Sequence, residues 1–353
     1  MTGVPRTVVV VGASGTVGSG LLAALAERPG VAVRAVCRHP PANGSTPGRA
    51  TWHALDLLAD DAADRLAELL EGAAAVVHLA WAIQPVGDSS TPRSTDLDGT
   101  AAVLDAADRA DVGHLVFLSS QAVYGPHAPG EPERPVDESW PVRAHPDSAY
   151  SRDKVAAEAM LDGFADDHPG VAVTRIRAAL VIRADAAARM RRLFLGPAVP
   201  SVLLRALRAG RVPLLPLPAG LVLQLVHADD LGRAVAAALD RRAGGTFNVA
   251  ADALGARGLA RVAGARPLPV PRSLVRAVLG LANRLGVLGA TTGWFDLAVD
   301  TPVIDTGRAR RELGWTPVVD TARAARILLD ALAETDPDGG SQPVSAPAAP
   351  GRG

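Results

Sequence analysis

A run of β-branched residues at 7–11 is followed at once by glycines at Gly12, Gly15 and Gly18, and then by a helical pattern over 19–28. This order predicts a buried strand, a tight turn and a helix. Gly12 permits the turn, Gly15 lets a pyrophosphate approach the backbone, and Gly18 allows close helix packing. The helix start offers N–H groups and a positive dipole to an anion. The residues predicted to hold a dinucleotide here are Gly12, Ser14, Gly15, Thr16, Val17 and Gly18.

Further strands and helices alternate through the first half of the chain. Strand patterns occur at 73–79, 114–118 and 171–176, and helical patterns at 99–110 and 149–166. Repeated strand–helix units predict a parallel, doubly wound sheet, that is, an α/β fold of Rossmann type.

The predicted dinucleotide-binding domain comprises residues 1–178 and 221–251. Residues 179–220 and 252–334 would form a smaller substrate-binding lobe. Residues 335–353 are rich in Pro, Gly, Ser and Ala, which predicts a disordered tail.

The second predicted strand, 31–37, ends at Arg38, where an acidic residue would bind the adenosine ribose of NAD. A guanidinium at this place attracts a 2′-phosphate, so we expect NADP(H) to be favoured, with NAD(H) left open. The alternative is a solvated arginine at a strand end. Asp56 and Leu57, after a short third strand, are candidate adenine contacts; an Asp at such a place more often caps a turn.

The only lysine and one of the two tyrosines stand four residues apart, as Lys154 and Tyr150. Since the other basic residues are arginine, a retained lysine indicates a need for a compact ammonium group. Residues four apart share one helix face. A nearby positive charge favours a phenolate, so we expect Lys154 to lower the pKa of Tyr150 from about 10. Tyr150 would then serve as an acid or base near neutral pH; the alternative is an exposed helical pair.

Other short motifs follow in a fixed order along the chain. They are His78-Leu-Ala80, Asp96-Leu-Asp-Gly99-Thr100, Ser119-Ser120-Gln-Ala-Val-Tyr124-Gly125, Val226-His227-Ala-Asp229-Asp230-Leu231, Phe247-Asn248-Val249 and Arg311-Glu-Leu-Gly-Trp315-x-Pro317. Together with the glycine loop and the Tyr150–Lys154 pair, they resemble the extended short-chain dehydrogenase/reductase family, also called the NAD-dependent epimerase/dehydratase family. Asp96 stands where the family has Asn. The resemblance covers nearly the whole folded chain.

The resemblance implies hydride transfer between a nicotinamide cofactor and a carbinol or ketone carbon. It assigns Tyr150 as the proton donor or acceptor, and Lys154 as a contact to the nicotinamide ribose that also lowers the Tyr150 pKa. Ser120 would hydrogen-bond the substrate oxygen. Leu79 and Ala80 would flank the cofactor.

The resemblance also implies a homodimer, in which the helix with Tyr150 pairs with the helix before it. The apolar residues expected to contribute are Val103, Leu104, Val155 and Leu161.

Departures from the family pattern narrow the substrate. Dehydratases carry Asp-Glu where this chain has Gln121 and Ala122, which argues against sugar dehydration. Nucleotide-sugar epimerases have an Arg where this chain has Leu223. Because segment 193–217 is also apolar, we favour reversible oxidoreduction of an apolar alcohol or ketone. Sugar-nucleotide epimerisation is the alternative, and a redox-sensing regulator without turnover is disfavoured because such relatives lose the tyrosine.

Composition excludes other classes of function. With a net charge of −1 and no basic stripe or long apolar span, the chain is expected to bind neither nucleic acid nor membrane, and its partner is a small molecule. The single cysteine, Cys37, has no companion for a disulfide or a metal site, so we expect it to be a small buried residue. A first strand too short for a signal-peptide core predicts a cytoplasmic protein.

Overall fold

The computed structural model describes residues 6–41, 50–82, 90–127, 134–191, 199–285 and 292–335. Its centre is a seven-stranded sheet in the order β10-β6-β5-β4-β1-β2-β3, and every pair in it is parallel. This order contains the 3-2-1-4-5-6 arrangement of a Rossmann sheet, with β10 added beyond β6. The strands are β1 (Arg6–Val11), β2 (Val31–Cys37), β3 (Ala50–Ala54), β4 (Ala75–His78), β5 (His114–Ser120), β6 (Ala172–Ala178) and β10 (Gly245–Val249).

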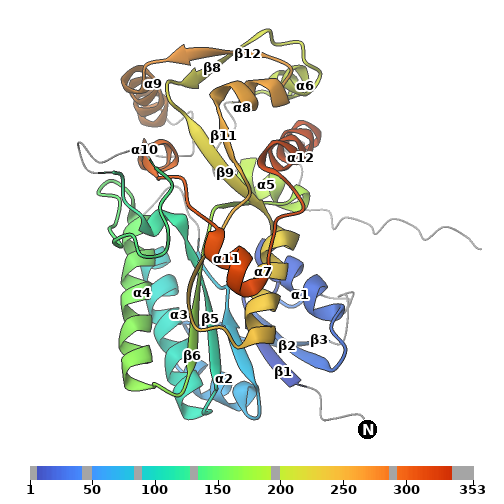
Figure 1. The fold of residues 1–353 in the computed structure, drawn as a ribbon, viewed down its shortest axis with the longest axis vertical. Helices are drawn as coiled ribbons and strands as arrows, with labels where there is room; N and C mark the ends of the chain where they lie inside the picture. The colour runs from blue at the N-terminus through green and yellow to red at the C-terminus, as the bar shows by residue number, and fades with distance from the viewer. Residues whose placement is uncertain are drawn as a thin grey trace, which may run out of the picture.

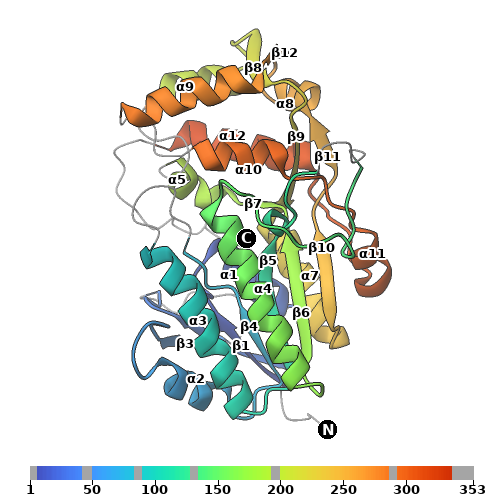
Figure 2. The ribbon, with the colours of Figure 1, turned by 90° about the vertical axis from the view of Figure 1, so that its left-hand side faces the viewer.

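Helices cover both faces of this sheet, because its strands are apolar on both sides. Val8 and Val10 of β1 pack with α1 (Thr16–Ala26) and α7 (Ala228–Arg241). Val9 and Val11 point to the opposite face, whose core includes side chains of α2 (Ala62–Leu70), α3 (Ser90–Arg109) and α4 (Ala149–Asp167). Figure 2 shows α3 and α4 side by side on that face. The predicted doubly wound α/β fold is therefore confirmed.

Most of the predicted elements lie close to the observed ones. β2 has the predicted bounds, and α4 extends one residue beyond the predicted 149–166. The helix predicted over 99–110 begins much earlier, at Ser90. Its first turns contain Pro, Thr and Asp rather than strong helix formers, so the sequence pattern does not mark its start.

A smaller lobe lies beyond one end of the sheet (Figure 1). It contains a three-stranded sheet of β7 (Leu180–Ile182), β9 (Val222–His227) and β11 (Ala253–Gly255), and a parallel pair of β8 (Leu214–Pro218) and β12 (Arg266–Val270). Its helices are α5 (Ala187–Met190), α6 (Ser201–Arg208), α8 (Ala256–Val262), α9 (Arg272–Arg284), α10 (Thr292–Asp300) and α12 (Thr321–Glu334). Within segment 221–251, α7 and β10 join the large sheet, whereas β9 pairs with β7 and β11. Conversely, α11 (Gly307–Leu313) packs on α7 and β10.

Candidate active site

The glycine turn forms a backbone cradle at the carboxyl end of β1. Gly12 has φ +88°, and a Cβ atom there would lie 2.5 Å from the Ala80 nitrogen at the end of β4. A Cβ on Gly18 would lie 2.3 Å from the Ala13 oxygen. Gly15 precedes α1 without any side-chain cap, so the first N–H groups of the helix face outward from the turn. This geometry fits a dinucleotide pyrophosphate, because Gly12 allows the tight turn against the end of β4 and Gly15 leaves the backbone at the start of α1 without a side chain.

The remaining residues predicted to bind the cofactor surround this cradle. Ser14 is exposed, Thr16 and Val17 are half-buried, and Leu79 is buried beside half-exposed Ala80. Gly12 and Ala13 donate their N–H groups to the Val36 oxygen, which places the end of β2 and the exposed Arg38 next to the turn.

Asp56 is exposed and Leu57 is buried. The Asp56 carboxylate accepts the Leu58 N–H at 3.2 Å, which is the turn-capping alternative for this residue.

Ser120 and Tyr150 meet at the carboxyl end of β5. A side-chain hydrogen bond joins them, and Ser120 Oγ also accepts the Ala122 N–H at 3.1 Å. The start of α4 is fixed by Ser148, which caps it, and by Ser151, whose hydroxyl donates to the Ala122 oxygen at 2.6 Å. The structure therefore brings the predicted hydroxyl pair together on rigid elements.

Lys154 lies one turn further along α4 and is 2% exposed. Its Nζ donates to the Leu118 oxygen at 2.7 Å and lies 3.3 Å from the ring centroid of Trp81. It also lies 4.7 Å from the ring of Phe117. Burial lowers the pKa of Lys154, against the opposing charges of Asp96 and Glu158. The ammonium group is thus held by a carbonyl oxygen and two aromatic faces.

Asp96, which replaces the family's Asn, is buried beside this lysine. Its Oδ1 accepts the Ala82 N–H at 2.6 Å. Burial raises the pKa of Asp96; the Ala82 hydrogen bond and the charge of Lys154 oppose that rise. An isolated buried carboxylate is costly, and the charges of Asp96 and Lys154 each oppose the pKa shift that burial causes in the other.

The prediction that Lys154 lowers the pKa of Tyr150 is wrong for the protein without cofactor. The pKa of Tyr150 is raised to about 12: desolvation raises it most, the hydrogen bond with Ser120 lowers it, and the charge of Asp96 raises it. Lys154 does not offset this rise in the pKa of Tyr150. Its Nζ donates to the Leu118 oxygen and lies against the Trp81 ring. The phenol is therefore protonated at neutral pH.

A spectrophotometric titration tests this correction, because the chain has only two tyrosines. Burial raises the pKa of Tyr124 as well, to about 12. We expect the tyrosinate absorbance of the protein without cofactor to stay flat to about pH 10.5, where an unperturbed tyrosine would be mostly ionised. Tyr124→Phe should give the same flat baseline. Ionisation of one tyrosine below pH 9 would contradict the raised pKa.

A buried polar network that the sequence analysis missed lies behind Ser120. Arg177 of β6 contacts Glu158 of α4 through Nε at 3.0 Å and Nη2 at 2.5 Å. Ser119 donates to the same carboxylate at 2.5 Å. Arg177 also donates to the Tyr124 hydroxyl, which donates to Asn248 at 2.8 Å. Glu158 follows Lys154 by four residues, so the helical spacing was the available signal.

Two tryptophans flank the Tyr150 ring, and neither was predicted to do so. Trp294 of α10 lies 5.3 Å from it between ring centroids, and Trp81 lies 6.4 Å away, edge to face. Both distances fall in the range of favourable aromatic pairs. Trp294 belongs to the lobe, so an apolar element of the lobe reaches the predicted catalytic residue.

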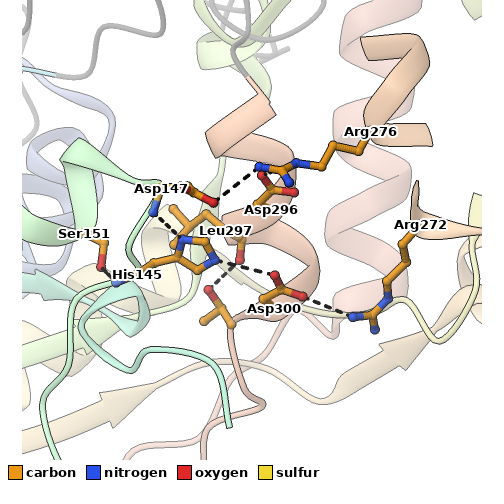
Figure 3. A network of polar contacts seen from close by, with 9 residues as sticks. His145, Asp147, Ser151, Arg272, Arg276, Asp296, Leu297 and Asp300 are labelled. Atoms are coloured by element: carbon orange, nitrogen blue, oxygen red, sulfur yellow. Dashed lines mark hydrogen bonds and ion pairs between the residues drawn. The ribbon is translucent and has the colours of Figure 1, made fainter. Parts of the chain in front are cut away.

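Ion pairs attach the lobe to the start of α4, as Figure 3 shows. Arg276 of α9 contacts Asp147 at 3.3 Å and Asp296 at 2.9 Å. Asp300 of α10 contacts His145 at 3.6 Å and Arg272 at 3.1 Å. These contacts hold α9 and α10 over the helix that carries Tyr150.

Other candidate residues have structural roles. His78 is buried and pairs with Thr100 at 3.1 Å; burial lowers its pKa to about 3, so it is neutral. Arg191 is buried and donates to Thr335, Val199 and Ser201, so its guanidinium is satisfied within the chain. Arg189 is exposed, while Arg192 and residues 193–198 of the apolar segment lie outside the described residues. Leu223 is a half-buried residue of β9.

The model of the NAD dependent epimerase/dehydratase family matches residues 8–250. The chain belongs to this family. Within it, an uncharacterized protein of Mycobacterium tuberculosis is 28% identical over 318 residues, covering 88% of this chain and 80% of that protein.

Two further comparisons concern proteins with named activities. A 4-hydroxy-2-methyl-3-oxo-4-farnesyl-3,4-dihydroquinoline-1-oxide ketoreductase of Stigmatella aurantiaca is 30% identical over 176 residues, half of each protein. The structure of Thermus thermophilus UDP-glucose 4-epimerase in complex with NAD superposes with a TM-score of 0.65 and 23% identity, covering 94% of this chain and all of that one. This likeness confirms the extended short-chain dehydrogenase/reductase fold.

Within the described ranges, no helix has the length and apolar composition needed to cross a bilayer. The same ranges contain no group of three or more His, Cys, Asp or Glu residues placed to hold a metal ion. Cys37 is buried and free, as its sequence context predicts.

Proposed function

We propose that this protein is an NAD(P)-dependent oxidoreductase that interconverts an apolar alcohol and its ketone. The observation that carries the proposal is the Tyr150 phenol, hydrogen-bonded to Ser120 and flanked by Trp81 and Trp294. The hydroxyl pair suits a carbonyl oxygen, and the aromatic rings suit an apolar substrate body. In this proposal, residues 1–178 and 221–251 hold the cofactor, and the lobe holds the substrate.

Each residue has a separate task in the proposed reaction. Bound nicotinamide supplies or accepts the hydride. Ser120 and Tyr150 hold the substrate oxygen, and Tyr150 gives that oxygen a proton in reduction or takes one in oxidation. Lys154 is placed to hold the nicotinamide ribose. Burial raises the pKa of Tyr150 to about 12, so the phenol is protonated at neutral pH and carries the proton that reduction of a ketone consumes.

The apolar substrate class has two independent supports. Leu223 stands where nucleotide-sugar epimerases of this family use Arg, so one bidentate partner for a pyrophosphate is missing. The Stigmatella ketoreductase, which is similar over half of this chain, acts on a farnesylated quinoline oxide by its name. A substrate with an apolar body next to a ketone is consistent with both.

Arg38 leads us to propose a preference for NADP(H) over NAD(H). Arg38 is exposed just after the end of β2, whose Val36 oxygen accepts from the glycine turn, and its guanidinium would pair with a 2′-phosphate. We expect Arg38→Asp to weaken NADPH binding by about tenfold to a hundredfold and to leave NADH binding unchanged or stronger, since a charged pair contributes about 1.5–3 kcal/mol. Fluorescence titration with both cofactors measures the ratio, and Arg65→Asp serves as a control at another exposed arginine. An unchanged ratio of affinities would refute the preference.

Epimerisation of a nucleotide sugar is the second candidate, since the superposed Thermus structure is an epimerase. An epimerase recycles its cofactor, whereas a reductase consumes it. Purified protein is therefore incubated with NADPH or NADH and either aryl and alkyl ketones or UDP-sugars. Loss of reduced cofactor with apolar ketones supports the proposal. Conversion of a UDP-sugar without net loss of cofactor refutes it, and cofactor binding with neither reaction favours a redox sensor.

We also propose a homodimer formed through α3 and α4. Two of the residues expected at that interface do not reach it, because Val103 and Leu161 are fully buried in the core of the sheet face. Leu104 and Val155 are half-buried and remain in place for such a contact.

A further inference from the structure

The end of the lobe exposes an apolar face on α9. Leu274, Val278, Leu281 and Leu285 are 53%, 58%, 59% and 68% exposed. Their spacing of four, three and four residues places them on one side of the helix, and no residue of α9 is fully buried. A stripe of this kind is unusual on a protein surface that contacts only water.

More exposed apolar side chains occur on the neighbouring elements. Figures 1 and 2 place α9, β8 and β12 together at the end of the molecule opposite the N-terminal strand. Leu214 of β8 is 50% exposed and Leu268 of β12 is 45% exposed. On α6, Val202 is 69% exposed and Leu203 is 43% exposed. Exposed apolar side chains therefore occur on several elements of the lobe.

This end of the lobe is also strongly basic. Segments 199–220 and 253–285 contain nine arginines and no Asp, Glu or Lys, in a chain whose net charge is −1. Arg208, Arg272 and Arg276 pair with acidic residues from elsewhere in the chain. The other six form no ion pair with any described residue; they are Arg205, Arg211, Arg257, Arg261, Arg266 and Arg284.

We propose that this end of the lobe binds the surface of an anionic lipid bilayer, with the apolar face of α9 lying in the interface. An amphipathic helix with leucines on one side and arginines beside them is the form that such helices take. A second copy of the chain is a poorer occupant, because a self-interface would bring arginines of like charge together. An interfacial helix needs no membrane-spanning segment, so this proposal departs from the expectation, drawn from net charge and the lack of a long apolar span, that the chain binds no membrane.

An ion pair joins α9 to α10, the helix that contacts Tyr150. Arg276 of α9 contacts Asp296 of α10, two residues after Trp294, whose ring lies against that of Tyr150. Bilayer binding would therefore place Trp294 near the source of a lipid-dissolved substrate. The binding itself is independent of the chemistry proposed above, since it is measured without cofactor or substrate.

Co-sedimentation of the full chain with vesicles tests the proposal. We expect binding to vesicles of 70:30 phosphatidylcholine and phosphatidylglycerol, and little binding to phosphatidylcholine alone. Val278→Ser/Leu281→Ser should weaken binding by at least about tenfold, because it removes apolar groups that enter the interface. Arg266→Gln/Arg284→Gln should weaken it by about thirtyfold, since each arginine near an anionic surface contributes about fivefold.

Matched controls remove the same kinds of groups from other surfaces. Val142→Ser/Val318→Ser changes two exposed valines, and Arg241→Gln/Arg311→Gln changes two arginines outside the lobe end. Both should bind the vesicles as the wild type does. Equal binding by test and control variants would overturn the proposal, as would wild-type protein that does not distinguish the two lipid compositions. A dimer that Val278→Ser/Leu281→Ser dissociates in sedimentation velocity would assign the face to a second copy and also overturn it.

Discussion

Tyr150→Phe is expected to lower kcat by about 10²–10⁴-fold, the usual contribution of a positioned acid or base. The phenylalanine keeps the ring between Trp81 and Trp294 and removes only the hydroxyl that Ser120 contacts. Cofactor affinity should therefore stay within about twofold of the wild type, since no hydroxyl contact to the glycine turn is lost. NADPH absorbance measures kcat, and fluorescence titration measures the cofactor dissociation constant.

Tyr124→Phe is the matched control, because it removes the only other phenol of the chain. Tyr124 is fully buried, and its hydroxyl bridges Arg177 and Asn248. Its loss should lower the free energy of unfolding by about 1–3 kcal/mol and leave kcat within about threefold. Near-normal turnover in Tyr150→Phe, or equal losses of turnover in the two variants, would refute the assignment of Tyr150 as the acid or base.

Glu158→Gln is expected to have the largest effect on stability, lowering the free energy of unfolding by about 3–5 kcal/mol. The Glu158 and Arg177 side chains are 4% and 6% exposed, and two guanidinium nitrogens contact the carboxylate. The amide leaves a buried guanidinium without a compensating charge, and desolvation is then no longer offset. Urea denaturation, followed by circular dichroism, measures the change.

Asp162→Asn is the control for this pair, on the same helix and strand. Asp162 of α4 contacts Arg175 of β6, but the Asp162 side chain is 71% exposed. Exposed pairs contribute about 0–1 kcal/mol, so this variant should be nearly as stable as the wild type. If the free energy of unfolding of Glu158→Gln fell no more than that of Asp162→Asn, the buried pair would not be a main source of stability.

The sequence predicted the large sheet well because its signals are local. Buried parallel strands are apolar along their whole length, as β1 is, and the turn at Gly12 requires a positive φ. The right-handed crossovers of strand–helix units then limit the possible strand orders to a few. Ser120, Tyr150 and Lys154 were found from motifs and helical spacing, and the structure brings Ser120 and Tyr150 into contact.

Features that depend on long-range packing could not be predicted in this way. The pKa of Tyr150 depends on what surrounds it, and the sequence spacing shows only that Lys154 lies on the same helix face. Trp294 reaches Tyr150 from a helix 144 residues later in the chain, which no local pattern encodes. The strand β9 is also apolar, so only its pairing with β7 and β11 places it in the lobe.

Deuterium transfer from the cofactor is the sharpest test of whether the protein reduces apolar ketones with Tyr150 as the acid. The protein is incubated with NADPH deuterated at C4, in both stereoisomers, and with a panel of apolar ketones, and the products are analysed by mass spectrometry. We expect an alcohol that carries one deuterium on the former carbonyl carbon, from one stereoisomer of the cofactor, and no such product with Tyr150→Phe. Absence of a deuterated alcohol across the panel, while the protein binds NADPH, would contradict it.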